Sequence, residues 1–218
     1  MTNDVTDIVM ILDKSGSMSG LEDDTIGGYN SMLEKQKARG GKCRVTTVLF
    51  NESIELVHDR ADIPEVKPMT NGDYRAGGMT ALIDAMGATM HKFLISDGMD
   101  KEEDKANKVI FVIITDGHEN SSREYSADKV REMVTNLKKN RGWEFVFLGA
   151  NIDSVRTATS YGISPALAQD FHCDEIGLKS GFDSLGDALC CFRVTAAMPA
   201  NWNEKLDEDF KKRKPRKK

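Results

Sequence analysis

Short apolar runs and longer amphipathic stretches alternate along the chain. Runs rich in β-branched and aromatic residues predict buried strands, and they fall at 5–12, 43–50, 53–58, 108–114, 143–148 and 171–173. Between them, apolar residues recur at steps of three and four, which predicts helices at 21–38, 81–95, 126–139 and 152–161 and within 176–198. Strands that alternate with helices indicate an α/β fold with a doubly wound, mostly parallel central sheet and helices on both faces.

Only two residues, Asn51 and Glu52, connect the second predicted strand to the third. So short a connection predicts a hairpin, and we therefore expect one antiparallel strand at an edge of the sheet. The final helix is predicted without defined ends, because Gly177, Gly181 and Gly186 interrupt its range and glycine lowers helix propensity.

The composition is that of an ordinary globular protein, with 39% hydrophobic and 30% charged residues among 218. This predicts one domain over residues 1–200, followed by a C-terminal extension over 201–218. No uncharged apolar run approaches the roughly 20 residues that span a bilayer, so we expect no transmembrane helix. The first apolar run is preceded by two aspartates and no basic residue, unlike a secretory signal, and we expect a cytoplasmic protein.

Charge is distributed unevenly along the chain. The net charge is −5, yet seven residues in 211–218 are basic and none is acidic. Such a block is typical of a disordered tail, with binding of nucleic acid or of an acidic partner as the alternative. The four cysteines include no pair with the CxxC spacing of a zinc site, and a chain of this length folds without disulfides. We therefore predict reduced, structural cysteines.

Oxygen-bearing side chains follow the first predicted strand in a tight loop. Asp13, Ser15 and Ser17 alternate there, and Gly16 relieves backbone crowding between the two serines. Alternate residues of such a loop can turn three oxygens toward one point, and a hard divalent cation such as Mg²⁺ requires oxygen ligands. By itself the spacing is a weak signal, because similar loops often serve only as turns or helix caps.

Two further segments of the same character follow. The sequence Gly-Gly-Met-Thr ends at Thr80, just before a predicted helix, and Asp116 comes after Thr115 at the end of the apolar strand at 108–114. In open α/β sheets, ligands bind at the carboxyl ends of the strands. We therefore expect the loop after Asp13 and these two segments to meet at one edge of the sheet.

This combination of Asp-x-Ser-x-Ser, a distant Thr and a distant Asp resembles the metal-ion-dependent adhesion site of von Willebrand factor A domains. Carried over position by position, the resemblance implies a divalent cation, with Mg²⁺ favoured over Mn²⁺ or Ca²⁺, held by Asp13, Ser15, Ser17, Thr80 and Asp116. The three hydroxyls would coordinate the ion, and the two carboxylates would act directly or through water. Segments 77–82 and 115–117 are also similar to those of the family's intracellular bacterial members, which include proteins of tellurium-resistance, stress and phage systems.

The resemblance implies a binding module rather than an enzyme. An Asp or Glu of a partner protein would fill an open position on the ion, because two carboxylates and three neutral hydroxyls leave the ion attractive to a further carboxylate. Candidate partner contacts near the site are Met18, Tyr74, Met79, His118 and Glu119. Simpler roles stay open for them, since methionine also fills gaps in cores and an exposed histidine can merely shape the rim of a site.

The main alternative is a Mg²⁺-dependent phosphatase that uses Asp13 as its nucleophile, as in the haloacid dehalogenase family. Those enzymes carry a second Asp two residues after the nucleophile as acid and base, and Ser15 occupies that position here. The lack of a GxxxxGK[ST] loop disfavours a nucleotide-binding ATPase, and Met18 at the centre of segment 16–20 disfavours a serine hydrolase. We therefore expect no catalytic residue.

Overall fold

The computed structural model describes residues 4–213. Its strands are β1 (Thr6–Asp13), β2 (Cys43–Phe50), β3 (Ile54–Asp62), β4 (Lys108–Thr115), β5 (Glu144–Ala150) and β6 (Ala168–Phe171). Its helices are α1 (Glu22–Arg39), α2 (Leu82–Met99), α3 (Ala127–Arg141), α4 (Ser154–Ser160), α5 (Glu175–Thr195) and α6 (Glu204–Lys212). Short 3₁₀ turns lie at Gly16–Met18, Ile63–Glu65 and Pro165–Leu167.

The strands form one sheet in the order β3-β2-β1-β4-β5-β6. All neighbouring strands are parallel except β2 and β3, which form an antiparallel hairpin at one edge. The predicted doubly wound α/β sheet with one antiparallel edge strand is therefore confirmed. The strand order reverses between β1 and β4, and sheets of this kind bind ligands beyond the carboxyl ends of the strands at such a point.

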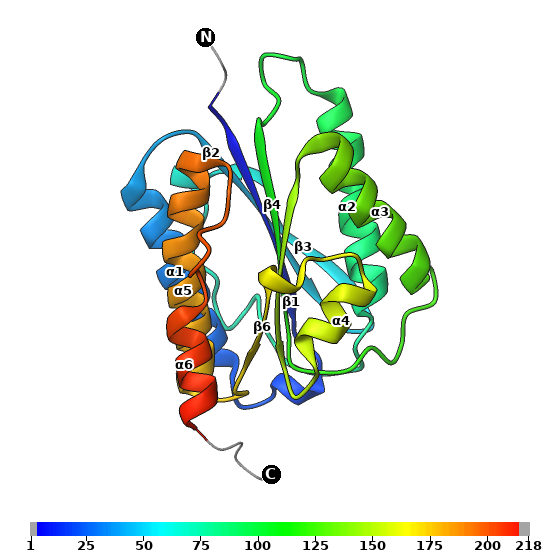
Figure 1. The fold of residues 1–218 in the computed structure, drawn as a ribbon, viewed down its shortest axis with the longest axis vertical. Helices are drawn as coiled ribbons and strands as arrows, with labels where there is room; N and C mark the ends of the chain where they lie inside the picture. Colours follow the sequence, from blue (N-terminus) through cyan, green and yellow to red (C-terminus); the bar gives the residue numbers. More distant parts are fainter. Residues whose placement is uncertain (1–3, 214–218) are drawn as a thin grey trace.

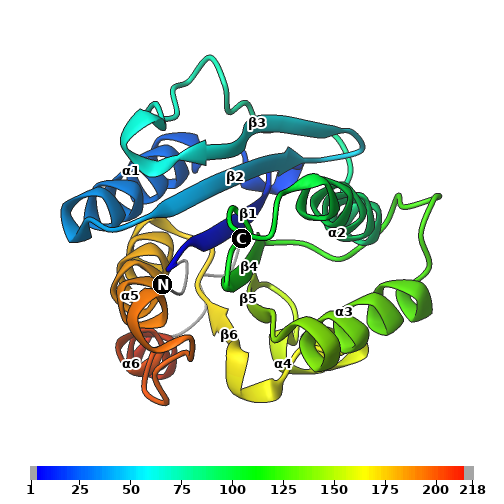
Figure 2. The same ribbon diagram turned by 90° about the horizontal axis from the view of Figure 1, so that it is seen from above.

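Helices cover both faces of the sheet (Figure 1). Seen from above in Figure 2, α1, α5 and α6 lie on one face, and α2, α3 and α4 lie on the other. The sequence of β1 explains this arrangement, because its side chains alternate between faces. Ile8 and Met10 pack in the core under α1 and α5, whereas Val9 and Ile11 pack in the core under α2 and α3. The central strands are thus buried on both sides, as their nearly continuous apolar sequences indicate.

Helix α5 runs unbroken through the glycines that left its ends undefined in the sequence. At Gly186, an added Cβ would come 2.9 Å from Cδ of Lys35 in α1. At Gly28 of α1, an added Cβ would come 2.3 Å from the ring of Phe182 in α5. Each glycine costs about 1 kcal/mol of helix propensity relative to alanine, and the close approach of α1 and α5 offsets that cost.

The last strand lies earlier than predicted. β6 covers Ala168–Phe171 and pairs with Phe147–Ala150 of β5, whereas the sequence suggested 171–173. Gln169 and Asp170 interrupt the apolar pattern of this short edge strand, so its sequence carries little of the β-rich signal on which the prediction depended. Cys173 consequently lies in the loop after β6.

The described part of the C-terminal extension, 201–213, packs on the domain. Trp202 and Leu206 are buried in the same core as α1 and α5, and Trp202 Nε1 donates to the carbonyl oxygen of Ala166 at 2.9 Å. Of the predicted disordered tail, Lys211 and Lys212 belong to the last turn of α6 and Arg213 caps it. Residues 214–218 lie outside the described residues. Within residues 4–213, no helix has the length and apolar character needed to cross a membrane.

Candidate metal centre

Asp13 is the last residue of β1, and its carboxylate is held by two donors. Oδ1 accepts a hydrogen bond from the backbone N–H of Ser15 at 2.7 Å, and Oδ2 accepts one from the hydroxyl of Thr115 at 2.6 Å. The first bond bends the loop directly after β1, and the second joins the end of β1 to the end of β4. The Asp13 side chain is thereby fixed between the two central strands.

The hydroxyls of Ser15 and Ser17 lie beside the carboxylate of Asp116. Ser15 Oγ and Ser17 Oγ are 3.1 Å apart, and Ser17 Oγ donates to Asp116 Oδ1 at 2.6 Å. Adjacent ligands of an octahedral Mg²⁺ ion with bonds of about 2.1 Å lie roughly 3.0 Å from each other. The spacing of these three oxygens is therefore close to that of adjacent ligand positions around such an ion.

Thr80 reaches the same region through the loop before α2. The N–H of Gly16 donates to the carbonyl oxygen of Gly78 at 3.0 Å, which joins this loop to the one after β1. An added Cβ on Gly117 would stand 3.4 Å from Ser17 Oγ and 3.6 Å from Thr80 Oγ1. Because glycine has no Cβ, space is left beside both hydroxyls. The structure thus brings all five predicted ligand residues to one edge of the sheet.

Four of the five side chains are buried, and Ser17 is exposed. Burial raises the pKa of the Asp13 carboxyl, against the lowering effect of the hydrogen bonds from Thr115 and Ser15. Among residues 4–213, no Lys or Arg forms an ion pair with Asp13 or Asp116. A buried carboxylate without a counter-ion is costly, and a cation at this position would supply the missing positive charge.

The predicted ligand residues offer only oxygen donors. Over the described part of the chain, no group of three or more His, Cys, Asp or Glu side chains is placed to hold a metal ion. An ion at this edge of the sheet would therefore depend on the hydroxyls of Ser15, Ser17 and Thr80 as well as on carboxylates. Oxygen ligands of this kind suit Mg²⁺, Mn²⁺ or Ca²⁺.

Two residues that sequence reasoning missed contact Asp116. Asn151 Nδ2 donates to the backbone oxygen of Asp116 at 3.3 Å, and Cys173 Sγ donates to Asp116 Oδ2 at 3.3 Å. Asn151 directly follows β5, and Cys173 follows β6 by two residues. The one signal that could have found them is this position after a strand, because the carboxyl ends of parallel strands meet at one edge.

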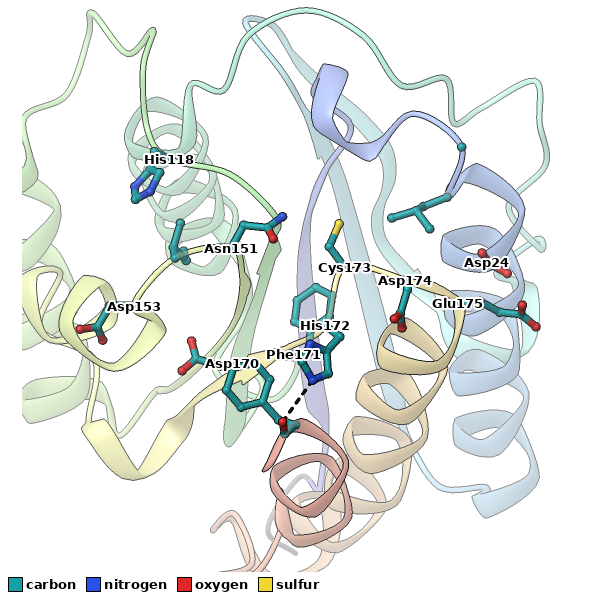
Figure 3. Close-up of a pocket in the computed structure, with 14 residues that line it drawn as sticks. Asp24, His118, Asn151, Asp153, Asp170, Phe171, His172, Cys173, Asp174 and Glu175 are labelled. Atoms are coloured by element: carbon teal, nitrogen blue, oxygen red, sulfur yellow. Dashed lines mark hydrogen bonds between the residues drawn. The ribbon is translucent and has the colours of Figure 1, made fainter. Parts of the chain in front are cut away.

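A cleft of about 660 Å³ opens beside these contacts. Figure 3 shows that side chains from the loops after β4, β5 and β6 line it, among them His118, Asn151 and Cys173. Its far wall includes His172, whose Nε2 lies 3.1 Å from the carbonyl oxygen of Phe210 in α6. The extension that follows the domain therefore closes one side of the cleft.

The predicted partner contacts divide into buried and exposed side chains. Met18 and Tyr74 are buried beneath the site, and the Tyr74 hydroxyl donates to the backbone oxygen at the end of β1 at 2.5 Å. The Glu119 carboxylate accepts hydrogen bonds from backbone N–H groups of α2 and of its own loop. These three side chains hold the loops in place, and contact of any of them with a partner stays a prediction. Met79, which is 49% exposed, and the exposed His118 remain at the rim.

Comparison with solved structures reveals relatives in fold. The PilB minor pilin from Streptococcus sanguinis matches with a TM-score of 0.61 and 12% identity, over 89% of this chain and 63% of that one. The manganese-loaded TRAP protein from Plasmodium vivax matches with a TM-score of 0.54 and 17% identity, over 84% of this chain and 74% of that one. Proximal thread matrix protein 1 from the mussel byssus, with a zinc-occupied MIDAS motif, matches with a TM-score of 0.57 and 15% identity, over 85% and 46%.

At these identities the structural likeness shows the fold alone. The chain spans 63% of the pilin and 46% of the byssus protein. No curated protein matches the sequence. The family model of the von Willebrand factor type A domain matches residues 7–166, which run from β1 to the 3₁₀ turn before β6 and make up most of the sequence. The chain therefore belongs to the von Willebrand factor type A domain family.

Proposed function

We propose that this chain is a metal-dependent protein-binding module that holds one Mg²⁺ ion and uses it to bind an acidic residue of a partner protein. The observation that carries the proposal is the run of close oxygens from Ser15 through Ser17 to Asp116. Two relatives in fold, one manganese-loaded and one with a zinc-occupied MIDAS motif, support a divalent cation here.

Each of the five residues has a defined part in holding the ion. Ser15, Ser17 and Thr80 offer neutral hydroxyl oxygens, and Asp116 offers a carboxylate that already accepts from Ser17. Asp13 orients the loop after β1 and adds a second negative charge. A bound ion supplies an electropositive position for a carboxylate, and the neutral hydroxyls leave its attraction for a partner's Asp or Glu largely intact.

The exposed Met79 and His118 at the rim would contact the partner around its acidic residue. We extend the proposal to a cytoplasmic location and to kinship with the family's intracellular bacterial members, which the sequence of segment 77–82 supports. A role of the basic tail toward nucleic acid or an acidic partner concerns residues that lie mostly outside the described part of the chain. The proposal includes no catalytic step.

Partner binding should require both the ion and Asp116. Proteins captured from a cell lysate in Mg²⁺ should be released by a chelator. Asp116→Ala should reduce capture at least about tenfold, because it removes an oxygen ligand and the acceptor for Ser17. Asp187→Ala, which removes an exposed carboxylate of α5, should capture like the wild type. Capture that persists both in chelator and in Asp116→Ala would contradict the proposal.

A further inference from the structure

Cys173 contacts the proposed ion site through the second oxygen of Asp116. Ser17 Oγ donates to Oδ1 of this carboxylate at 2.6 Å, and Cys173 Sγ donates to Oδ2 at 3.3 Å. One buried carboxylate is therefore shared between a hard hydroxyl and a soft sulfur. The function proposed above uses the hydroxyl and leaves the sulfur without a role.

The position of the sulfur is compatible with metal ligation. A thiolate bonded to Zn²⁺ at about 2.3 Å and a carboxylate oxygen at about 2.1 Å stand roughly 3.1 to 3.6 Å apart for bond angles between a right angle and the tetrahedral value. The distance of 3.3 Å from Cys173 Sγ to Asp116 Oδ2 falls within this range. The sulfur and this carboxylate oxygen could therefore bond to one ion without a change in their separation.

Cys173 differs from Cys43 and Cys190 in its exposure and its surroundings. Cys173 is partly exposed and lines the 660 Å³ cleft, in which Figure 3 shows its side chain between the loops after β5 and β1. Cys43 is buried, and burial raises the pKa of its thiol to about 12. Cys190 Sγ contacts Gln36 of α1, away from the metal site. Solvent and ions can therefore reach the Cys173 sulfur from the cleft.

Resting on the metal-dependent function above, we propose that Cys173 is a specificity-determining residue that raises the affinity of the site for thiophilic divalent cations, such as Zn²⁺ and Co²⁺, relative to Mg²⁺. Sulfur ligands favour such ions, whereas Mg²⁺ prefers oxygen. When a thiophilic ion binds, a sulfur–metal bond forms, the S–H bond breaks, and the proton passes to solvent.

Cobalt reports sulfur ligation directly, because a Co²⁺–thiolate bond gives a charge-transfer absorption band in the near ultraviolet. Co²⁺ added to the full chain should produce this band. Cys173→Ser replaces the thiol with a hydroxyl of similar shape and should lose the band. It should also lower the ratio of Zn²⁺ affinity to Mg²⁺ affinity, measured by calorimetry, at least about tenfold. Cys191→Ser, which removes an exposed thiol of α5, should change neither quantity.

The outcomes separate this inference from the function on which it rests. If Mg²⁺ binds to the wild type and not to Asp116→Ala, the ion site is supported, whatever the cobalt spectrum shows. A wild-type cobalt complex without the band, or an unchanged affinity ratio in Cys173→Ser, would overturn the role of the thiol alone. A band that survives in Asp116→Ala would assign the sulfur to a different metal site and overturn it as well. Failure of the wild type to bind any of the three cations would overturn the ion site itself.

Discussion

Saturating Mg²⁺ or Mn²⁺ should raise the Tm of the wild-type protein by roughly 5–10 °C, and Asp13→Ala should lose most of this rise. An ion that binds only the folded state adds about 2.7 kcal/mol at a hundred times its Kd, and a domain of this size gains about 2–4 °C per kcal/mol. Asp13 has this effect because its carboxylate both adds charge to the site and holds the loop that carries Ser15 and Ser17.

Asp13→Ala also removes the acceptor for Thr115, so its Tm without metal should fall. The quantity to compare is therefore the rise of each variant above its own chelated form, measured by differential scanning fluorimetry. Asp13→Asn, which keeps an acceptor oxygen but not the charge, should fold better than Asp13→Ala and show the same reduced rise. Asp187→Ala should behave like the wild type. A rise in Asp13→Ala equal to that of the wild type would place the ion elsewhere.

Phe111→Ala should lower the free energy of unfolding by about 3–5 kcal/mol. Phe111 lies in β4 and is fully buried. Its ring centroid is 5.0 Å from that of Phe145, 5.6 Å from that of Trp143 and 5.7 Å from that of Phe93. Removal of the ring would leave a cavity among three aromatic side chains that lose their contacts with it. Urea denaturation monitored by circular dichroism measures the loss.

Val194→Ala is the matched control for this prediction, because Val194 is 62% exposed on α5. Its effect on the free energy of unfolding should stay within about 0.5 kcal/mol. A loss below about 1 kcal/mol for Phe111→Ala would be that of an ordinary peripheral substitution and would contradict the central position of β4.

The strands of the sheet could be predicted wherever an apolar run fits only a buried strand. β1 and β4 are buried along their whole length, and their central residues form nearly continuous apolar runs that are typical of strands covered on both faces. β6 and α5 were harder for opposite reasons. The edge position of β6 allows polar residues within the strand, and the packing of α5 on α1 requires small residues that local propensity disfavours.

Residues of the candidate site could be predicted only where they lie at the end of a helix or strand that the sequence reveals. Asp13 and Asp116 follow strong strands, and the alternation of Ser15 and Ser17 is local. The contact of Cys173 with Asp116 joins the loops that follow β6 and β4, with β5 between these strands. Its distance depends on loop geometry that the sequence does not reveal.

The same dependence on loop packing explains why Met18 and Tyr74 could be named only as candidate partner contacts. Both belong to loops, where residue type alone does not distinguish a buried anchor from an exposed contact. The structure buries both beneath the site, and Tyr74 hydrogen-bonds to the backbone at the end of β1. Their role is thus to support the ligand loops from below.

Anomalous diffraction from crystals grown with Mn²⁺ tests the central claim most directly. The account predicts one strong anomalous peak at bonding distance from Ser15 Oγ and Ser17 Oγ, with Thr80 and Asp116 as further ligands, directly or through water. It also predicts that the peak is absent from crystals of Asp13→Ala. A peak at any other group of side chains, or no peak at Mn²⁺ concentrations that raise the Tm, would contradict the assignment of this edge of the sheet as the metal site.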